Sequence, residues 1–103
     1  MYIKDPMHPG EFLLSVFMKP YGITCEEMAR NLGVSASTVS RITSKKMDLT
    51  AGMAMRLSIV VGRTPESWMI MQNNYSLNKF VSKNQSELSS LKRIKFDFDG
   101  EVE

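Results

Sequence analysis

The sequence predicts an all-α protein, with a body of five helices followed by a C-terminal extension. Start and stop signals for helices recur along the first 80 residues, and no segment there alternates with the period of two that is typical of strands. The chain has 103 residues, of which 43% are hydrophobic and 23% charged, a composition ordinary for one small folded domain. We therefore expect a helical domain over residues 1–80 and a polar extension over residues 81–103.

The five helices are placed by their capping residues. Thr24 with Glu27 forms a capping box, and the run Thr64-Pro65-Glu66 combines a cap, a proline and an acid in a first turn. Gly33 ends one helix because glycine adopts a positive φ at little cost. The helices are expected from Pro9 to about Pro20, from Thr24 to Gly33, from Ala36 to Thr43, from Thr50 to Gly62, and from Thr64 to about Phe80. In the first of them, the inward face is expected to carry Phe12, Leu13, Val16 and Phe17.

The extension carries one pattern of its own. Ile94, Phe96 and Phe98 alternate with charged residues, which is typical of a short half-buried strand. A lone strand on a helical body has no sheet of its own to join. Two interpretations therefore stay open: the segment pairs with a two-fold mate or another protein, or it frays in solution.

Several functional classes are disfavoured by composition. Cys25 is the only cysteine, which excludes an internal disulfide and a thiolate-rich metal site. His8 is the only histidine and lies beside helix-start residues, so we expect a structural role for it. Enzyme activity, a metal and a cofactor are not expected. No basic-then-apolar leader opens the sequence and no apolar run approaches membrane-spanning length, so a cytoplasmic protein without membrane contact is expected.

The segment from Thr24 to Lys46 predicts two short helices that meet at a steep angle. Such a pair needs a small residue on the first helix, a glycine at the corner and branched apolar residues on the second, which this sequence supplies as Ala29, Gly33, Val39 and Ile42. With Val39 and Ile42 inward, the advance of about 100° per residue turns other side chains outward. The outward set is Ser37, Ser40 and Arg41, with Ser35 and Ala36 near the entering end.

This outward face suits the major groove of DNA. Short hydroxyl side chains let a helix backbone approach base edges, and an arginine can hold guanine O6 and N7 with two hydrogen bonds. Between residues 30 and 56 five bases stand against one acid, Asp48, which is the footprint of a phosphate-binding surface. The alternative is that the hydroxyls form only a capping and turn-rich surface. A third possibility is that the helix pair is a protein-interaction element with little DNA binding.

Residues 8–80 resemble the HigA family of toxin–antitoxin antidotes, also described as virulence-associated protein I-like, within the Xre/Cro-type repressors. The matching runs are HPGEFL at 8–13, MARNLGVSASTVSRI at 28–42, LTAGMAMRLSIVVG at 49–62 and TPESWMIMQNNYSL at 64–77. The family commonly has Gly-Lys after the recognition helix, where this chain has Ser44-Lys45. It also commonly has Tyr-Asp-Leu where this chain has Tyr75-Ser76-Leu77.

The resemblance implies a five-helix, lambda-repressor-like helix–turn–helix domain that acts as a dimer. It implies a repressor that binds a palindromic operator in double-stranded DNA and neutralises a HigB-type mRNA endonuclease; a stand-alone Xre-type repressor is the alternative. By motif position the base-contacting residues would be Ser35, Ala36, Ser37, Ser40 and Arg41. Those contacting phosphates would be Thr24, Cys25, Thr38, Lys45 and Lys46. The two half-sites would lie about 34 Å apart.

The fifth helix offers residues for the dimer. Trp68, Met71 and Tyr75 are candidates for the interface, and aromatic residues are enriched in interface cores. For Trp68 itself the preferred interpretation is an anchor between the fifth helix and the first or fourth, and a dimer contact is the alternative. The methionines at helical spacings are expected mostly to fill the core, namely Met28, Met53, Met55, Met69 and Met71.

Overall fold

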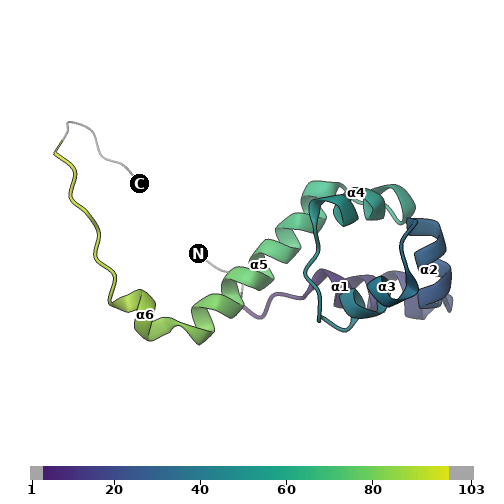
Figure 1. The fold of residues 1–103 in the computed structure, drawn as a ribbon, viewed down its shortest axis with the longest axis horizontal. Coiled ribbons are helices and arrows are strands. Elements are labelled where there is room, and N and C mark those ends of the chain that lie inside the picture. Colours follow the sequence, from purple (N-terminus) through teal and green to yellow (C-terminus); the bar gives the residue numbers. More distant parts are fainter. Residues whose placement is uncertain (1–3, 98–103) are drawn as a thin grey trace.

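The computed structural model describes residues 4–97, and this part of the chain is helical from Pro9 to Ser89 apart from short connections (Figure 1). The α-helices are α1 (Pro9–Phe12), α2 (Cys25–Leu32), α3 (Ala36–Thr43), α4 (Ala51–Val60), α5 (Pro65–Lys83) and α6 (Gln85–Ser89). The first four helices and the start of α5 form a bundle, and the rest of α5 runs out of it toward α6 (Figure 1). No residue between 4 and 97 forms a strand. The predicted all-α class is therefore confirmed.

Hydroxyl side chains cap the starts of α2, α3, α4 and α5. The capping residues are Thr24, Ser35, Thr50 and Thr64. In each case the side-chain oxygen accepts a hydrogen bond from the backbone N–H three residues later, at distances between 3.0 and 3.3 Å. A cap of this kind stabilises a helix by about 1 kcal/mol. The predicted starts of these four helices are confirmed.

The first helix departs from the predicted pattern. After α1 the chain continues as a π-helix, Leu13–Met18, and then as a 3₁₀ turn, Lys19–Tyr21. In a π-helix each N–H bonds five residues back, as Lys19 N–H does to the Leu14 carbonyl. Residues five apart then share a face, so Leu13 and Met18 are both buried. Val16 was predicted to face inward from the 3.6-residue period, and this was wrong: its side chain is 41% exposed.

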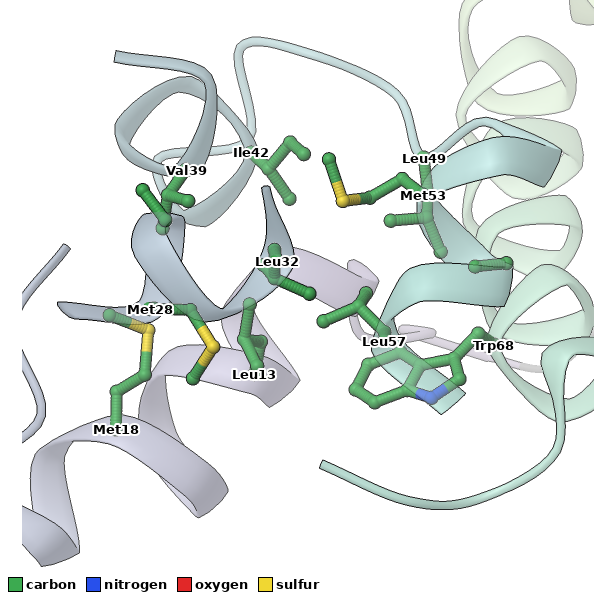
Figure 2. Close-up of a cluster of buried hydrophobic side chains, with 12 residues drawn as sticks. Leu13, Met18, Met28, Leu32, Val39, Ile42, Leu49, Met53, Leu57 and Trp68 are labelled. Carbon is green, nitrogen blue, oxygen red and sulfur yellow. The ribbon is translucent and has the colours of Figure 1, made fainter. Parts of the chain in front are cut away.

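One core joins all the helices of the bundle. Its buried members are Leu13, Met18, Met28, Ala29, Leu32, Val39, Ile42, Leu49, Met53, Ala54, Leu57 and Trp68 (Figure 2). Met28 and Met53 fill it as predicted, and Met69 and Met71 pack half-buried against it. Met55 does not, because it lies on the outer side of α4 and is 52% exposed.

Trp68 is the central anchor of the fifth helix. Its side chain is fully buried, its indole N–H donates to the Gly62 carbonyl over 3.0 Å, and its ring meets that of Phe12 edge-on at 5.7 Å. The preferred interpretation, an anchor that ties α5 to the first helix, is therefore correct. The alternative of a dimer contact is wrong for Trp68, because its side chain has no surface left for a second chain. Met71 and Tyr75 are half-buried.

The C-terminal extension leaves the bundle along α5. This helix ends at Lys83, three residues beyond the predicted Phe80, because neither a glycine nor a proline interrupts it. After α6, residues 91–97 have no regular secondary structure, and Leu91, Ile94 and Phe96 are 68%, 69% and 67% exposed. Phe98, the last apolar residue of the predicted strand, lies outside the described residues. No helix within residues 4–97 is both long and apolar enough to cross a membrane.

Candidate nucleic-acid interface

The third helix has one buried and one exposed side, in the predicted rotation. Val39 and Ile42 are 1% and 3% exposed, whereas Ser37, Ser40 and Arg41 are exposed on the other side. Within the part of the chain that the structure describes, the guanidinium of Arg41 makes no hydrogen bond or ion pair. A free guanidinium beside short side chains is able to reach a groove floor and bond a base edge.

The hydroxyl groups at the start of α3 form a local cluster. The Ser35 Oγ accepts from the Thr38 N–H and lies 2.9 Å from the Thr38 Oγ1 and 3.2 Å from the Ser37 Oγ. The hydroxyl groups of Ser35 and of half-buried Thr38 are therefore already engaged at the cap of the helix. Ala36 is also half-buried and packs against the core, which leaves only part of its methyl group for a ligand. Ser37 and Ser40 are the hydroxyl residues most open to a partner.

A glycine corner sets the angle between α2 and α3. Gly33 adopts φ +72°, and its N–H and that of Val34 bond back to the carbonyls of Arg30 and Ala29. The Arg56 guanidinium donates to the Leu32 carbonyl over 2.8 Å, which ties α4 to the same corner. Arg56 is one of the five bases counted between residues 30 and 56, and its position gives it this structural role as well.

The exit of α3 is a second left-handed turn. Lys45 takes φ +67°, and the N–H groups of Lys45 and Lys46 bond back to the carbonyls of Ile42 and Arg41. Ser44 has φ −92°, so serine is compatible with the position where the family commonly has glycine. The Lys45 Nζ lies 3.9 Å from the Glu11 Oε1, with both side chains 48% exposed. Lys46 is exposed. The turn thus presents two lysines beside the free face of α3.

Two residues that were not predicted for the site support α3 and the segment that follows it. A Cβ on Gly10 would lie 1.8 Å from the Ile42 carbonyl oxygen, so only glycine lets α1 approach the last turn of α3 this closely. Gln72 is 4% exposed, and its Oε1 accepts from the Leu49 N–H over 2.7 Å while its Nε2 donates to Asp48. Gln72 follows Trp68 by four residues and shares its helix face. A polar residue at an inward-facing position of this helix was the feature of the sequence that could have indicated its role.

His8 is a structural residue, as predicted. It is fully buried, its Nδ1 accepts the Gly10 N–H over 2.9 Å, and its ring meets that of Tyr75 edge-on at 4.8 Å. Among the described residues its Nε2 has no hydrogen-bond partner. Burial lowers the pKa of His8, which outweighs the opposing effects of Asp48 and Glu11. The neutral ring therefore caps α1 at neutral pH.

The start of α2 provides the remaining predicted contacts. Thr24 is exposed while its Oγ1 caps the Glu27 N–H, and Cys25 is half-buried with its side chain against the core. The first N–H groups of α2 point out of the helix end, where an anion is favoured. Residues 4–97 place no group of three or more His, Cys, Asp and Glu side chains that could hold a metal ion.

The glycine corner, the buried Val39–Ile42 side and the exposed hydroxyl and arginine side together define a helix–turn–helix protein. Residues 17–68 match the protein family described as Helix-turn-helix. This match runs from the π-helix that follows α1 to Trp68 and so covers most of the bundle.

Similarity to individual proteins shows which family of helix–turn–helix proteins the chain belongs to. The chain is 35% identical over 80 residues to virulence-associated protein I of Dichelobacter nodosus, covering 78% of this chain and 74% of that protein. It is 34% identical over 91 residues to antitoxin HigA-1 of Vibrio cholerae, covering 88% and 86%. The solved structure of antitoxin GraA in complex with its operator matches with a TM-score of 0.82 and 34% identity, covering 93% of this chain and 97% of that one. The chain belongs to the HigA family of helix–turn–helix antitoxins.

Proposed function

We propose that this protein is the antitoxin of a type II toxin–antitoxin module, which represses its own operon and neutralises a HigB-type mRNA endonuclease. The observation that carries the DNA-binding part is the exposed side of α3, where Arg41 is free and Ser37 and Ser40 are open. Its relative GraA binds an operator, and the same helix pair is present here.

The proposed contacts fall into two classes. Ser37, Ser40 and Arg41 read bases, and Arg41 to guanine would contribute about 1–3 kcal/mol of discrimination against a wrong base. Ser35 and Ala36 lie at the entering end of the helix and contribute less, because capping and core packing occupy part of their surface. Phosphates are held by Lys45 and Lys46 and by the start of α2, at Thr24 and Cys25, and Thr38 supports this set through Ser35.

A dimer is proposed through α5. Ile70, Leu77 and Phe80 are 58%, 48% and 51% exposed, and their spacing of seven and three residues places them along one stripe of the helix. A second copy of α5 would cover that stripe with Met71 at its edge, whereas Tyr75 lies on the other side of the helix. Two recognition helices separated by one turn of DNA, about 34 Å, would then face successive major grooves of a palindrome.

The DNA-binding proposal is tested with the promoter DNA upstream of the first reading frame of this protein's operon. Binding is measured by fluorescence anisotropy against a scrambled duplex of equal length. We expect specific binding by the wild type, and a loss of about tenfold or more for Arg41→Ala on the operator alone. Equal operator binding by the two proteins would reject the role of Arg41. Absence of any preference by the wild type would reject sequence-specific repression.

The antitoxin proposal is tested by growth. The reading frame next to this gene is expected to encode a small basic toxin, and its expression should arrest growth unless this protein is present. Arg41→Ala should rescue growth as well as the wild type, because the recognition face is used for DNA. If the wild type binds the operator but does not rescue growth, the antitoxin proposal is rejected. The alternative of a stand-alone Xre-type repressor then remains.

A further inference from the structure

A cleft opens where the exit turn of α3 meets the second half of α5. It has a volume of about 390 Å³, and its lining includes Lys45, Lys79 and Lys83 together with Glu11, Asp5 and Tyr75. The lysines come from two elements that are 34 residues or more apart in sequence, so the fold itself gathers them. Asn78 and Ser82, which carry hydrogen-bonding side chains, complete the α5 wall.

Lys79 lies away from the centre of the proposed dimer stripe. Tyr75, Lys79 and Lys83 follow one another at intervals of four residues, on the continuation of the face that Gln72 buries in the bundle. Ile70 and Leu77 lie on the other side of the helix, whereas Phe80 lines an adjoining cleft together with both lysines. A second copy centred on Ile70 and Leu77 would therefore leave Lys79 open.

Three lysines and two acids, Asp5 and Glu11, line the cleft, which gives a net charge of +1 before the neighbouring Asp48 is counted. Glu11 faces Lys45 at 3.9 Å, an exposed ion pair of the kind that is easily exchanged for another anion. Asp48 lines an adjoining cleft with Lys79 and Lys83, but it accepts a hydrogen bond from Gln72. Among residues 4–97, neither Lys79 nor Lys83 forms an ion pair, and the Lys79 Nζ lies 5.9 Å from the centre of the Tyr75 ring.

We propose that Lys79 and Lys83, together with Lys45, hold phosphates of the DNA backbone beside the segment that α3 reads, so that α5 widens the protein's footprint on the operator. This inference rests on the proposed function. Lys45 belongs both to the exit turn of α3 and to the cleft, so a duplex that reaches Lys45 passes the mouth of the cleft. Lys79 and Lys83 add attraction that depends on backbone charge alone and carries no sequence preference.

The test compares K79Q/K83Q with wild type on two duplexes from the upstream region. One ends at the limits of the base-read segment found by footprinting, and the other has ten additional base pairs on each side. On the longer duplex, the double variant should lose about eightfold in affinity at 0.1 M salt for each lost phosphate contact. The plot of log K against log salt should flatten by about 0.9 for each contact. On the shorter duplex the two proteins should bind nearly equally.

Two further variants separate the cleft from general charge effects. K92Q removes an exposed lysine beyond α6 that lines neither cleft, and it should bind like the wild type. E11Q removes the acid that faces Lys45 and should bind DNA about two- to fivefold more tightly, the range that an exposed ion pair is worth. Circular dichroism melting checks that each variant is folded.

The outcomes distinguish this inference from the proposed function. If the wild type prefers the operator and K79Q/K83Q matches it in affinity and salt slope on both duplexes, the α5 contact is rejected while the repressor role stands. The local contact would also be rejected if K92Q lost as much affinity as K79Q/K83Q does. The same holds if K79Q/K83Q lost as much affinity on the short duplex as on the long one. If the wild type shows no preference for the operator, the proposed function itself fails.

Discussion

Gly10→Ala should displace the recognition helix, because it inserts a methyl group where two backbones touch. The added Cβ would lie 1.8 Å from the Ile42 carbonyl oxygen and 2.5 Å from the Ile42 carbonyl carbon, and real Cβ atoms essentially never come closer than 3.0 Å. The obstacle is backbone, so α1 and the end of α3 must separate by more than about 1 Å. Overpacking costs about 1–3 kcal/mol and more where backbone must move, so we expect a loss of about 3 kcal/mol or more.

The matched control is Gly52→Ala. Gly52 is the second residue of α4, as Gly10 is of α1, yet nothing lies within 4 Å of a Cβ added there. That substitution should stabilise the protein by about 0.4–1 kcal/mol, because it restricts the unfolded chain. Thermal unfolding should show Gly10→Ala melting about 12 °C or more below the wild type, and Gly52→Ala melting slightly above it.

Operator binding by Gly10→Ala, measured well below its melting temperature, should fall while that of Gly52→Ala stays at the wild-type value. If the two variants melt within a few degrees of each other and bind alike, α1 does not position α3 through this contact, and the reasoning is refuted.

Three other substitutions test the supports of the site. Gln72→Met keeps the shape of the side chain but leaves the buried Leu49 N–H without a partner, which should cost about 1–3 kcal/mol in urea unfolding; an unchanged midpoint would contradict this. Lys45→Gly relieves a left-handed lysine and should raise stability by up to about 1 kcal/mol while flattening the salt dependence of DNA binding; a lower melting temperature would count against it. Because burial lowers the pKa of His8 below its ordinary value near 6.5, the unfolded chain binds more protons than the folded chain as pH falls through 6.5, so stability should fall from about pH 7 downward. His8→Asn should flatten that dependence over the same range, and an equal slope in both proteins would rule out His8 as its source.

The parts of the fold that depend on local chemistry were predictable from the sequence. Thr24, Ser35, Thr50 and Thr64 cap the helices that they were predicted to begin, because a hydroxyl three residues before an orphan N–H satisfies it in almost any context. The rotation of α3 followed from two branched residues three apart, Val39 and Ile42. Those two predictions are sufficient to place the exposed face that carries Arg41.

The parts that depend on tertiary packing were not predictable in the same way. The π-helical turn after α1 moved Val16 outward and Met18 inward, and no residue there signals five-residue hydrogen bonding. Trp68 was expected as an anchor on the first or the fourth helix, and the choice of Phe12 on the first helix as its ring partner depends on how the elements pack. The role of Gly10 depends on how closely α1 meets Ile42, which no local pattern specifies.

The most direct measurement is a double-mutant cycle between Arg41 and the DNA. Each guanine of one operator half-site is replaced in turn by 7-deazaguanine, which lacks the N7 acceptor, and binding of wild type and Arg41→Ala is measured on every duplex. At one position the wild type should lose about 1–3 kcal/mol while Arg41→Ala loses nothing further. Losses that are equal for the two proteins at every guanine would show that the exposed side of α3 does not read the groove.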